Sequence, residues 1–214
     1  MTKLPNRNWF IDKLTQEIKK TQVQPEYKYA ILFLDCDNFK MINDSLGHIV
    51  GDRILQEIPL RLKSCLNKNS FLGRLGGDDF ILLLSELPDY EAVMSITAQI
   101  QESLADSFVI DQKDIFLNFS IGIVFGDPKY SQPEQLLRNA DLAMYRAKDL
   151  GKGQYQIYNQ EMHHYALERL HLETDLRIAI KKPEFFLQYQ PIFTLDRSIL
   201  KSFEALIRWQ HPQK

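Results

Sequence analysis

The sequence has few of the features that mark secreted or membrane-inserted proteins. It contains only two cysteines, Cys36 and Cys65, which lie far apart and match no metal-binding spacing, so we expect reduced thiols in a cytoplasmic protein. The start, MTKLPNRNWF, lacks the apolar segment of a signal peptide. No apolar run reaches the roughly 18 residues of a membrane-spanning helix. We therefore expect no membrane segment in this chain, which leaves room for an anchor upstream in a longer protein.

An excess of one charge is also absent. The 26 basic and 28 acidic residues leave a formal net charge of −2, so we expect no general attraction to nucleic acid or to an anionic membrane. Any phosphate-bearing ligand must be held by a local site. Hydrophobic residues make up 44% and charged residues 25% of the chain, as in ordinary globular proteins, and there are no internal repeats.

Hydrophobic periodicity predicts interleaved helices and strands up to about residue 158. Continuous apolar runs indicate buried strands, and apolar spacings of three and four indicate amphipathic helices. Pro59 lies inside one predicted helix, where it removes a hydrogen bond and is expected to cause a kink. The predicted helices are 4–22, 38–48, 51–66, 89–106 and 133–150, and the predicted strands are 27–37, 70–75, 79–85, 107–111, 115–125 and 154–158.

One turn distinguishes between the possible fold classes. Gly76-Gly77 separates two apolar runs, and glycine supplies the positive φ that a tight hairpin needs. A tight hairpin argues against a purely parallel, doubly wound sheet. We therefore expect an α/β (α+β) sandwich with a mixed, mostly antiparallel central sheet flanked by helices.

The composition changes after residue 158. We predict one domain over 1–158, a polar helical connector over 159–182, and two new strands over 183–214 joined by a turn at 195–198. Two or three strands cannot bury a core of their own. The segment 183–214 is therefore expected to be the truncated beginning of a second domain.

Carboxylates stand at the ends of two predicted strands. Asp35 ends the first buried strand, and Asp78 stands in the hairpin turn. If these strands are neighbours, the two carboxylates converge and form an oxygen-rich site suited to Mg²⁺. Solvated turn aspartates are the alternative. Alternation along the hairpin predicts that Asp79 points in a different direction from Asp78.

Polar residues near these carboxylates are suited to a nucleotide. Lys40 lies at the start of a predicted helix, where free N–H groups and the helix dipole favour phosphate. The Asn43 amide both donates and accepts hydrogen bonds, and Asp52 can accept from the N1–H and the amine of guanine. Each of these residues alone is better explained as an ordinary helix-end residue.

Several segments together resemble a known family. The resemblance is to the GGDEF domain of diguanylate cyclases and covers roughly residues 2–158, while the tail FFLQYQPIFTLDRSILKSFEALIRWQHP resembles the opening of an EAL domain, the cyclic di-GMP phosphodiesterase fold. The five matching segments occur in the family's order: LPNR, LDCDNFKMINDSLGHIVGD, RLGGDDF, SIGI and ADLAMYRAKDLGKGQY.

The resemblance implies a fold, a reaction and a set of residue roles. The fold would be the palm-like sandwich of nucleotidyl cyclases and polymerases. Two GTP molecules would become cyclic di-GMP and two pyrophosphates across a homodimer, with Mg²⁺ or Mn²⁺ as cofactor. Asp78, Asp79 and Lys40 would be catalytic. Asp35, Asp78 and the Cys36 backbone carbonyl would bind metal, and the substrate would contact Asn38, Phe39, Lys40, Asn43, Asp52, Gly76, Gly77, Lys148 and Lys152.

The sequence departs from the family pattern at a few positions. Asp79 stands where the family has Glu, one methylene longer, so turnover is expected to fall even if GTP binds. Lys152 replaces a common Arg and loses bidentate geometry. Asn67 and Ser70 replace the Arg and Asp of an inhibitory RxxD site, so no product inhibition is expected there. Glu204 matches an EAL metal ligand, but the remaining ligands are missing, so no phosphodiesterase activity is expected.

Two functions follow from these departures. The domain is either an active or weakly active diguanylate cyclase, or a GTP-binding regulatory module that controls the EAL phosphodiesterase of the full-length protein. A dimerisation scaffold is a third, weaker alternative. An upstream sensory region is expected as a further part of the full-length protein.

Overall fold

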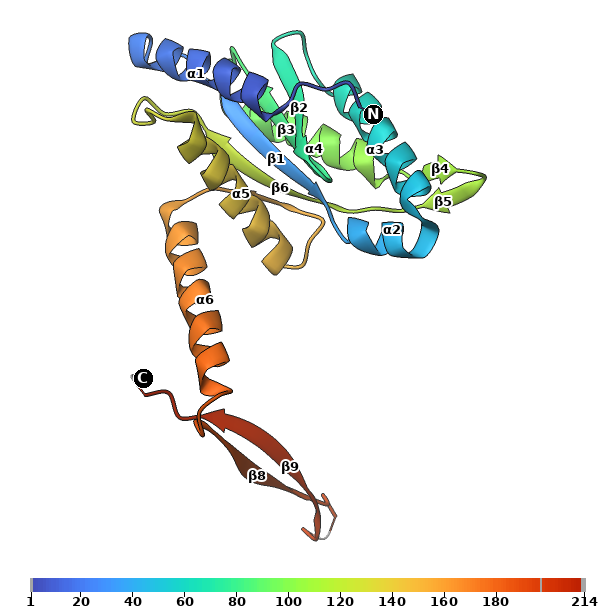
Figure 1. Ribbon diagram of the computed structural model, residues 1–214, viewed down its shortest axis with the longest axis vertical. Coiled ribbons are helices and arrows are strands. Elements are labelled where there is room, and N and C mark those ends of the chain that lie inside the picture. The colour runs from blue at the N-terminus through green and yellow to red at the C-terminus, as the bar shows by residue number, and fades with distance from the viewer. Residues whose placement is uncertain (1, 197, 213–214) are drawn as a thin grey trace. The chain divides into compact units, whose positions relative to one another are not determined.

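The computed structural model describes residues 2–196 and 198–212, which form two compact units (Figure 1). The first unit ends at His163 and the second begins at His164. The first unit contains a five-stranded sheet in the order β2-β3-β1-β6-β7. All neighbouring strands are antiparallel except β6 and β7, which confirms the mixed, mostly antiparallel sheet. The strands are β1 (Ala30–Cys36), β2 (Ser70–Gly76), β3 (Asp79–Leu84), β6 (Phe119–Phe125) and β7 (Tyr155–Ile157).

Helices cover both faces of this sheet, as Figure 1 shows. One face packs against α1 (Arg7–Val23) and α5 (Pro133–Asp149), and the other against α3 (His48–Ser64) and α4 (Glu91–Ala105). The short helix α2 (Phe39–Leu46) connects β1 to α3. Because both faces of the central strands are buried, their sequences are continuous apolar runs, which is why these strands were predictable.

Alternation along β1 determines where its acidic end lies. Ala30, Leu32 and Leu34 belong to the core cluster that includes α3 and α4, whereas Ile31 and Phe33 belong to the cluster that includes α1 and α5. Successive side chains of a strand point to opposite faces. Asp35 therefore continues the row that faces α1 and α5.

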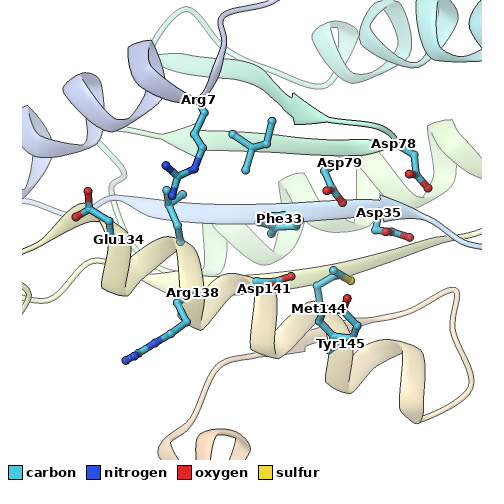
Figure 2. A pocket seen from close by; sticks show the side chains of 12 residues that line it. Arg7, Phe33, Asp35, Asp78, Asp79, Glu134, Arg138, Asp141, Met144 and Tyr145 are labelled. Atoms are coloured by element: carbon cyan, nitrogen blue, oxygen red, sulfur yellow. The ribbon is translucent and has the colours of Figure 1, made fainter. Parts of the chain in front are cut away.

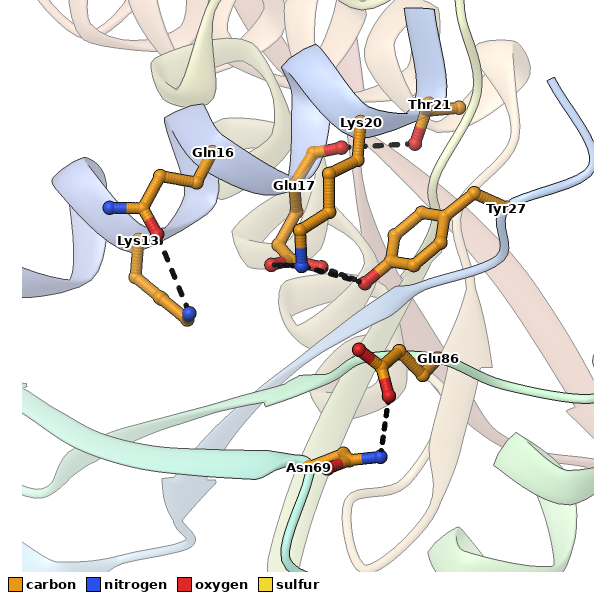
Figure 3. Close-up of polar contacts among 8 residues, drawn as sticks. All are labelled: Lys13, Gln16, Glu17, Lys20, Thr21, Tyr27, Asn69 and Glu86. Atoms are coloured by element: carbon orange, nitrogen blue, oxygen red, sulfur yellow. Dashed lines mark hydrogen bonds and ion pairs between the residues drawn. The ribbon is translucent and has the colours of Figure 1, made fainter. Parts of the chain in front are cut away.

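A buried acid fastens α1 to the segment that leads into β1 (Figure 3). Glu17 has a fully buried side chain and accepts a hydrogen bond from Lys20 Nζ at 3.0 Å. It also accepts one from the Tyr27 hydroxyl. The ammonium and the hydroxyl compensate for the loss of water around this carboxylate.

Two sequence predictions in this unit are wrong. The single strand expected over 115–125 is divided into β5 (Lys113–Ile115) and β6, because β5 pairs with β4 (Phe108–Ile110) in a separate two-stranded sheet. The turn between β4 and β5 consists of Asp111 and Gln112, whose φ values of 51° and 63° allow the chain to reverse within two residues. The helix expected from Gly51 begins earlier, at His48.

The second unit consists of most of α6 (Gln160–Ala179) and a hairpin of β8 (Phe185–Phe193) and β9 (Leu200–Trp209). The helix and both strands confirm the elements expected there, although residue 197 of the predicted turn lies outside the described residues. The domain boundaries at 158 and 182 stay predictions. Among the described residues, no helix is both long and apolar enough to cross a membrane. Large apolar side chains of the hairpin are exposed, namely Phe186, Leu187, Tyr189, Ile192, Phe193, Leu200, Phe203 and Ile207.

Candidate active site

The predicted hairpin turn joins β2 to β3. Gly77 has a φ of +49°, and a Cβ at Gly76 or Gly77 would meet no atom within 4 Å, so the backbone here is open on its outer side. Arg74 fixes the turn by donating from Nε to the Gly77 carbonyl oxygen at 2.9 Å. The turn therefore offers bare backbone to a ligand while its own conformation is held.

A first cavity, which we call the acidic cavity, lies on the α1 and α5 side of the sheet end (Figure 2). Its volume is about 450 Å³. Figure 2 shows Asp35 on β1 next to Asp79 on β3, with Asp78 beside them. All three are only partly exposed. The full lining comprises Arg7, Phe33, Asp35, Leu75, Asp78, Asp79, Glu134, Leu137, Arg138, Asp141, Met144 and Tyr145.

The position of Asp79 is fixed by its pairing with Asp35. Asp79 pairs directly with Asp35 across the β1–β3 ladder, and partners in such a pair share one face of the sheet. Asp78 belongs to the turn, where strand alternation does not apply, and it lines a second cavity as well as this one, so the expected difference in direction between Asp78 and Asp79 stays a prediction. Burial, followed by the charges of Asp35 and Asp78, raises the pKa of Asp79 to about 6.

A cation already lies among these carboxylates. Lys148 Nζ forms an ion pair with Asp35 Oδ1 at 2.7 Å. Burial, with the charges of Asp78 and Asp37, raises the pKa of Asp35 above its ordinary value although the Lys148 ammonium lowers it. Burial is the largest single influence on the pKa of Lys148 and lowers it, but the hydrogen bond and charge of Asp35, together with Tyr145 and Asp37, raise this pKa above its ordinary value, so the lysine stays charged. Contact of Lys148 with a triphosphate stays a prediction.

Sequence reasoning missed Asp141, which also lines the acidic cavity. Asp141 lies on α5 two turns before Lys148, and burial raises its pKa. The helix backbone approaches β6 closely, since a Cβ at Gly122 would lie 1.9 Å from the Ala140 carbonyl oxygen. This contact brings the polar side of α5 next to β1. The spacing of seven residues between Asp141 and Lys148 is the signal that would have shown their common face.

A second cavity of about 350 Å³, which we call the α2–α3 cavity, lies on the other side of the turn. It brings together six predicted site residues from α2, α3 and the turn between β2 and β3. These are Phe39, Lys40, Asn43, Asp52 and Gly77, and Asp78 lines this cavity as well as the acidic one. The remaining lining residues were not predicted: Asp44, His48, Leu55 and Arg74.

Gly51 determines how Asn43 lies in this cavity. A Cβ at Gly51 would stand 2.0 Å from Asn43 Oδ1 and 3.2 Å from the ring of Phe39. No side chain fits there without moving the asparagine. The absent side chain of Gly51 thus allows the Asn43 amide to pack against α3.

Two further predicted residues meet at the start of α2. Lys152 Nζ donates to Asn38 Oδ1 at 2.7 Å, which joins the loop after α5 to the loop after β1. Asn38 has a φ of 61° and precedes the first residue of α2. Neither residue lines the two cavities, so their contact with a substrate stays a prediction.

The carboxylates fit a divalent cation. Among the described residues, no group of three or more His, Cys, Asp or Glu side chains is arranged to hold a metal by itself. Two carboxylates with one backbone carbonyl, the set predicted from Asp35, Asp78 and Cys36, suit Mg²⁺, which usually keeps waters and substrate phosphates as its other ligands. The Cys36 thiol is buried and its pKa is raised, so only its carbonyl is a candidate. The raised pKa values of Asp35 and Asp79 indicate negative charge that a cation would stabilise.

The two positions compared with an inhibitory site form an ordinary turn. Ser70 Oγ donates to Asn67 Oδ1 at 2.8 Å, and the Ser70 N–H donates to the Asn67 carbonyl oxygen at 3.1 Å. These neutral side chains satisfy each other at the start of β2. The absence of product inhibition through these positions stays a prediction.

Comparison with known proteins decides the family. The family described as the diguanylate cyclase GGDEF domain matches residues 1–154. The chain belongs to this family. The GGDEF domain of YfiN (TpbB) from Pseudomonas aeruginosa has a similar structure, with a TM-score of 0.71 and 33% identity over 74% of this chain and 99% of that one.

Curated relatives of this GGDEF protein are longer. The cyclic di-GMP phosphodiesterase PdeR of Escherichia coli is 36% identical over all of this chain and 32% of its own length. The bifunctional diguanylate cyclase/cyclic di-GMP phosphodiesterase MucR of Pseudomonas aeruginosa is 34% identical over all of this chain and 31% of its own length. The chain therefore spans about a third of the relatives that it matches, and these relatives differ in the activities that their names state.

Proposed function

We propose that this domain is a diguanylate cyclase that condenses two GTP molecules into cyclic di-GMP in bacterial second-messenger signalling. The observation that carries the proposal is the position of Asp78, which lines both cavities. A nucleotide with its base in the α2–α3 cavity would extend its phosphates past this turn toward the carboxylates. Membership of the GGDEF family supports the same activity.

Asn43 and Asp52 are suited to select guanine. The Asp52 carboxylate would accept hydrogen bonds from the guanine N1–H and exocyclic amine, and the Asn43 amide would both donate and accept. Adenine has an acceptor at N1 and no amine at C2, so its lone pair would face the Asp52 carboxylate. GTP should therefore bind in strong preference to ATP.

The triphosphate would lie along the start of α2. The N–H groups near Asn38 and Phe39 stand at the positive end of this helix, and Gly76 and Gly77 allow the backbone to approach a ligand. Lys40, Lys148 and Lys152 would supply the compensating positive charge.

Asp35, Asp78 and the Cys36 carbonyl would hold Mg²⁺ or Mn²⁺. When bound, such an ion would neutralise phosphate charge and stabilise the leaving pyrophosphate. Asp35 would then exchange its ion pair with Lys148 for the metal, which would release the Lys148 ammonium toward a phosphate oxygen.

The reaction requires two domains, each with one GTP, and hence a homodimer. The 3′-oxygen of one GTP attacks the α-phosphorus of the other, the bond from that phosphorus to the bridging oxygen breaks, and pyrophosphate leaves. A second, symmetric step closes the ring. Asp79 has a pKa of about 6 and is ionised at pH 7, so it would accept the proton of the 3′-hydroxyl. Lys40 would stabilise the charge that develops on the phosphate.

The test is incubation of the protein with GTP and Mg²⁺, followed by chromatography of the products. We expect cyclic di-GMP and pyrophosphate in a ratio of one to two, with a rate per protomer that rises with protein concentration as dimers form. ATP should yield no cyclic dinucleotide. GTP binding without any cyclic di-GMP at high protein concentration would contradict a cyclase.

Asp79 favours a second candidate function. Aspartate is shorter than the family's glutamate by one methylene, about 1.5 Å, and a misplacement of about 1 Å can cost 10²-fold in rate. The domain would then bind GTP without turnover and control an EAL phosphodiesterase in the full-length protein. The name of the relative PdeR is in line with this role. Micromolar GTP binding by calorimetry, with no product, would support it, and absence of GTP binding would exclude it.

We further propose that β8 and β9 begin the EAL domain of a longer protein. The exposed apolar side chains of the hairpin need a partner surface, and Glu204 stands on β9 in the segment that resembles the EAL motif. Hydrogen exchange of both strands should be slower in the full-length protein than in this chain. Equal exchange rates would contradict the proposal.

A further inference from the structure

Asp37 is a buried carboxylate that the proposed chemistry does not use. It follows β1 directly and is only 4% exposed. Its oxygens accept hydrogen bonds from Ser120 Oγ at 2.8 and 3.0 Å and from the Gly153 N–H at 2.9 Å. Among the described residues it forms no ion pair, so these hydrogen bonds replace its water shell.

The loop that Asp37 holds has three consecutive residues with positive φ. Gly151, Lys152 and Gly153 have φ values of 124°, 66° and 60°. The left-handed region is unfavourable for a lysine, so neighbouring contacts must hold it there. The Lys152 N–H donates to the Ala147 carbonyl oxygen at 3.1 Å, and the Gly153 N–H donates to Asp37.

This loop carries Lys152 to the start of α2. Lys152 Nζ reaches Asn38 Oδ1 at 2.7 Å, and Asn38 follows Asp37 in the chain. The Asp37 N–H is itself fixed by the Asn118 carbonyl oxygen at 2.9 Å. One buried residue thus connects the turn before α2, the start of β6 and the loop after α5.

We propose that Asp37 is a positioning residue for the triphosphate, which holds the 151–153 loop so that the Lys152 ammonium stays beside the N-terminus of α2. Asp37 itself does not touch the nucleotide. This inference rests on the proposed GTP binding and adds a residue that acts on the phosphates and leaves the base contacts unchanged.

The test compares the dissociation constants of GTP, by calorimetry, and of guanosine, by NMR titration. Asp37→Ala should weaken GTP binding about tenfold, the order expected for one charge-assisted contact. The affinity for guanosine should stay unchanged. Asp37→Asn keeps an oxygen that accepts from Gly153 and should restore most of the GTP affinity. In a Lys152→Ala background, Asp37→Ala should have little further effect.

Asp127→Ala is the matched control, because Asp127 also accepts a backbone N–H, from Lys129 at 2.9 Å, but in the loop after β6. It should change neither affinity. If Asp37→Ala does not fold, Ser120→Ala can replace it, because it removes one hydrogen-bonding partner of the Asp37 carboxylate. Ser120→Ala should reduce the GTP affinity by less than tenfold and leave the guanosine affinity unchanged.

Failure of the proposed GTP binding and failure of the proposed role of Asp37 would give different results. Absence of GTP binding by the unsubstituted protein would overturn the proposed function and this inference together. Three outcomes would overturn the inference alone. Asp37→Ala could leave the GTP affinity unchanged, or it could reduce the affinities for GTP and guanosine equally. The effects of Asp37→Ala and Lys152→Ala on GTP affinity could also be additive.

Discussion

The acidic cavity and the α2–α3 cavity share Asp78 but compensate their charges differently. In the α2–α3 cavity, acidic side chains stand among basic ones such as Lys40 and Arg74. The acidic cavity is also lined by Arg7 and Arg138, but there Asp35, Asp79 and Asp141 are partly buried, and the pKa of each is raised. Lys148 is the cation paired with one of these carboxylates.

This difference suggests a division of roles. Raised carboxylate pKa values mean that the ionised folded state is less stable than it would be with a cation bound. The acidic cavity therefore suits a metal ion and the reacting phosphates. The α2–α3 cavity brings Asn43 and Asp52 together and suits recognition of a base. Substitutions that affect one cavity, or both, can test this division.

The largest effect is expected where the cavities meet. Asp78→Asn keeps the shape of the side chain but removes the charge that both cavities share. Cyclase turnover should fall on the order of 10³-fold, as for the loss of one electrostatic group in other enzymes. Initial rates of cyclic di-GMP formation measure it. Asp12→Asn, on the exposed side of α1, is the control, and a rate for Asp78→Asn within twofold of the control would contradict the role of Asp78.

Asp79→Glu alters only the acidic cavity. If the short acid limits proton transfer, the longer side chain should raise turnover by up to about 10²-fold and leave GTP affinity unchanged. Rates and calorimetry on the same samples separate the two quantities. Asp79→Asn, which cannot accept a proton, should lower turnover. A lower rate for Asp79→Glu would show that the natural length is already suited to the reaction.

Gly51→Ala alters only the α2–α3 cavity. The new Cβ would stand 2.0 Å from Asn43 Oδ1 and displace this amide. GTP affinity should fall about tenfold, the order of one buried hydrogen bond, while Mn²⁺ affinity of the acidic cavity stays constant. In an Asn43→Ala background, Gly51→Ala should reduce the GTP affinity only slightly. Independent, additive losses would mean that Gly51 acts by another route.

Local patterns made much of the fold predictable. The continuous apolar run of β1 and the Gly76-Gly77 turn led directly to a mixed sheet with a central hairpin. Lys40, Asn43 and Asp52 of the α2–α3 cavity were predictable as a set because they lie on two consecutive helices, whereas four other lining residues were not predicted. Their resemblance to the motifs of a known family strengthened that set.

Long-range contacts made the rest unpredictable. The direction of Asp79 depends on its register with Asp35, which no local pattern reveals. The place of Asp141 depends on the close packing of α5 on Gly122. The division of the strand expected over 115–125 depends on a two-residue turn whose positive φ values do not require glycine.

The smallest expected effect is on stability and concerns the acidic cavity without metal. Asp79 has its usual pKa of about 4 in the unfolded chain and about 6 in the folded protein. Between these values the folded protein binds more protons, so the free energy of unfolding falls as the pH rises through this window and is constant above it. Solvent screening reduces the effect, because Asp79 is partly exposed.

Scanning calorimetry at pH 4 and pH 7 would measure this effect. The Tm of the metal-free protein should fall by about 2–3 °C more between these values than that of Asp79→Asn. The variant should keep a smaller slope, because the pKa values of Asp35 and Asp141 are raised in the same direction. Mg²⁺ at pH 7 should stabilise the unsubstituted protein more than the variant. Parallel Tm curves for the two proteins would mean that the charge of Asp79 is already compensated, and the contrast between the two cavities would then rest on Asp35 and Asp141 alone.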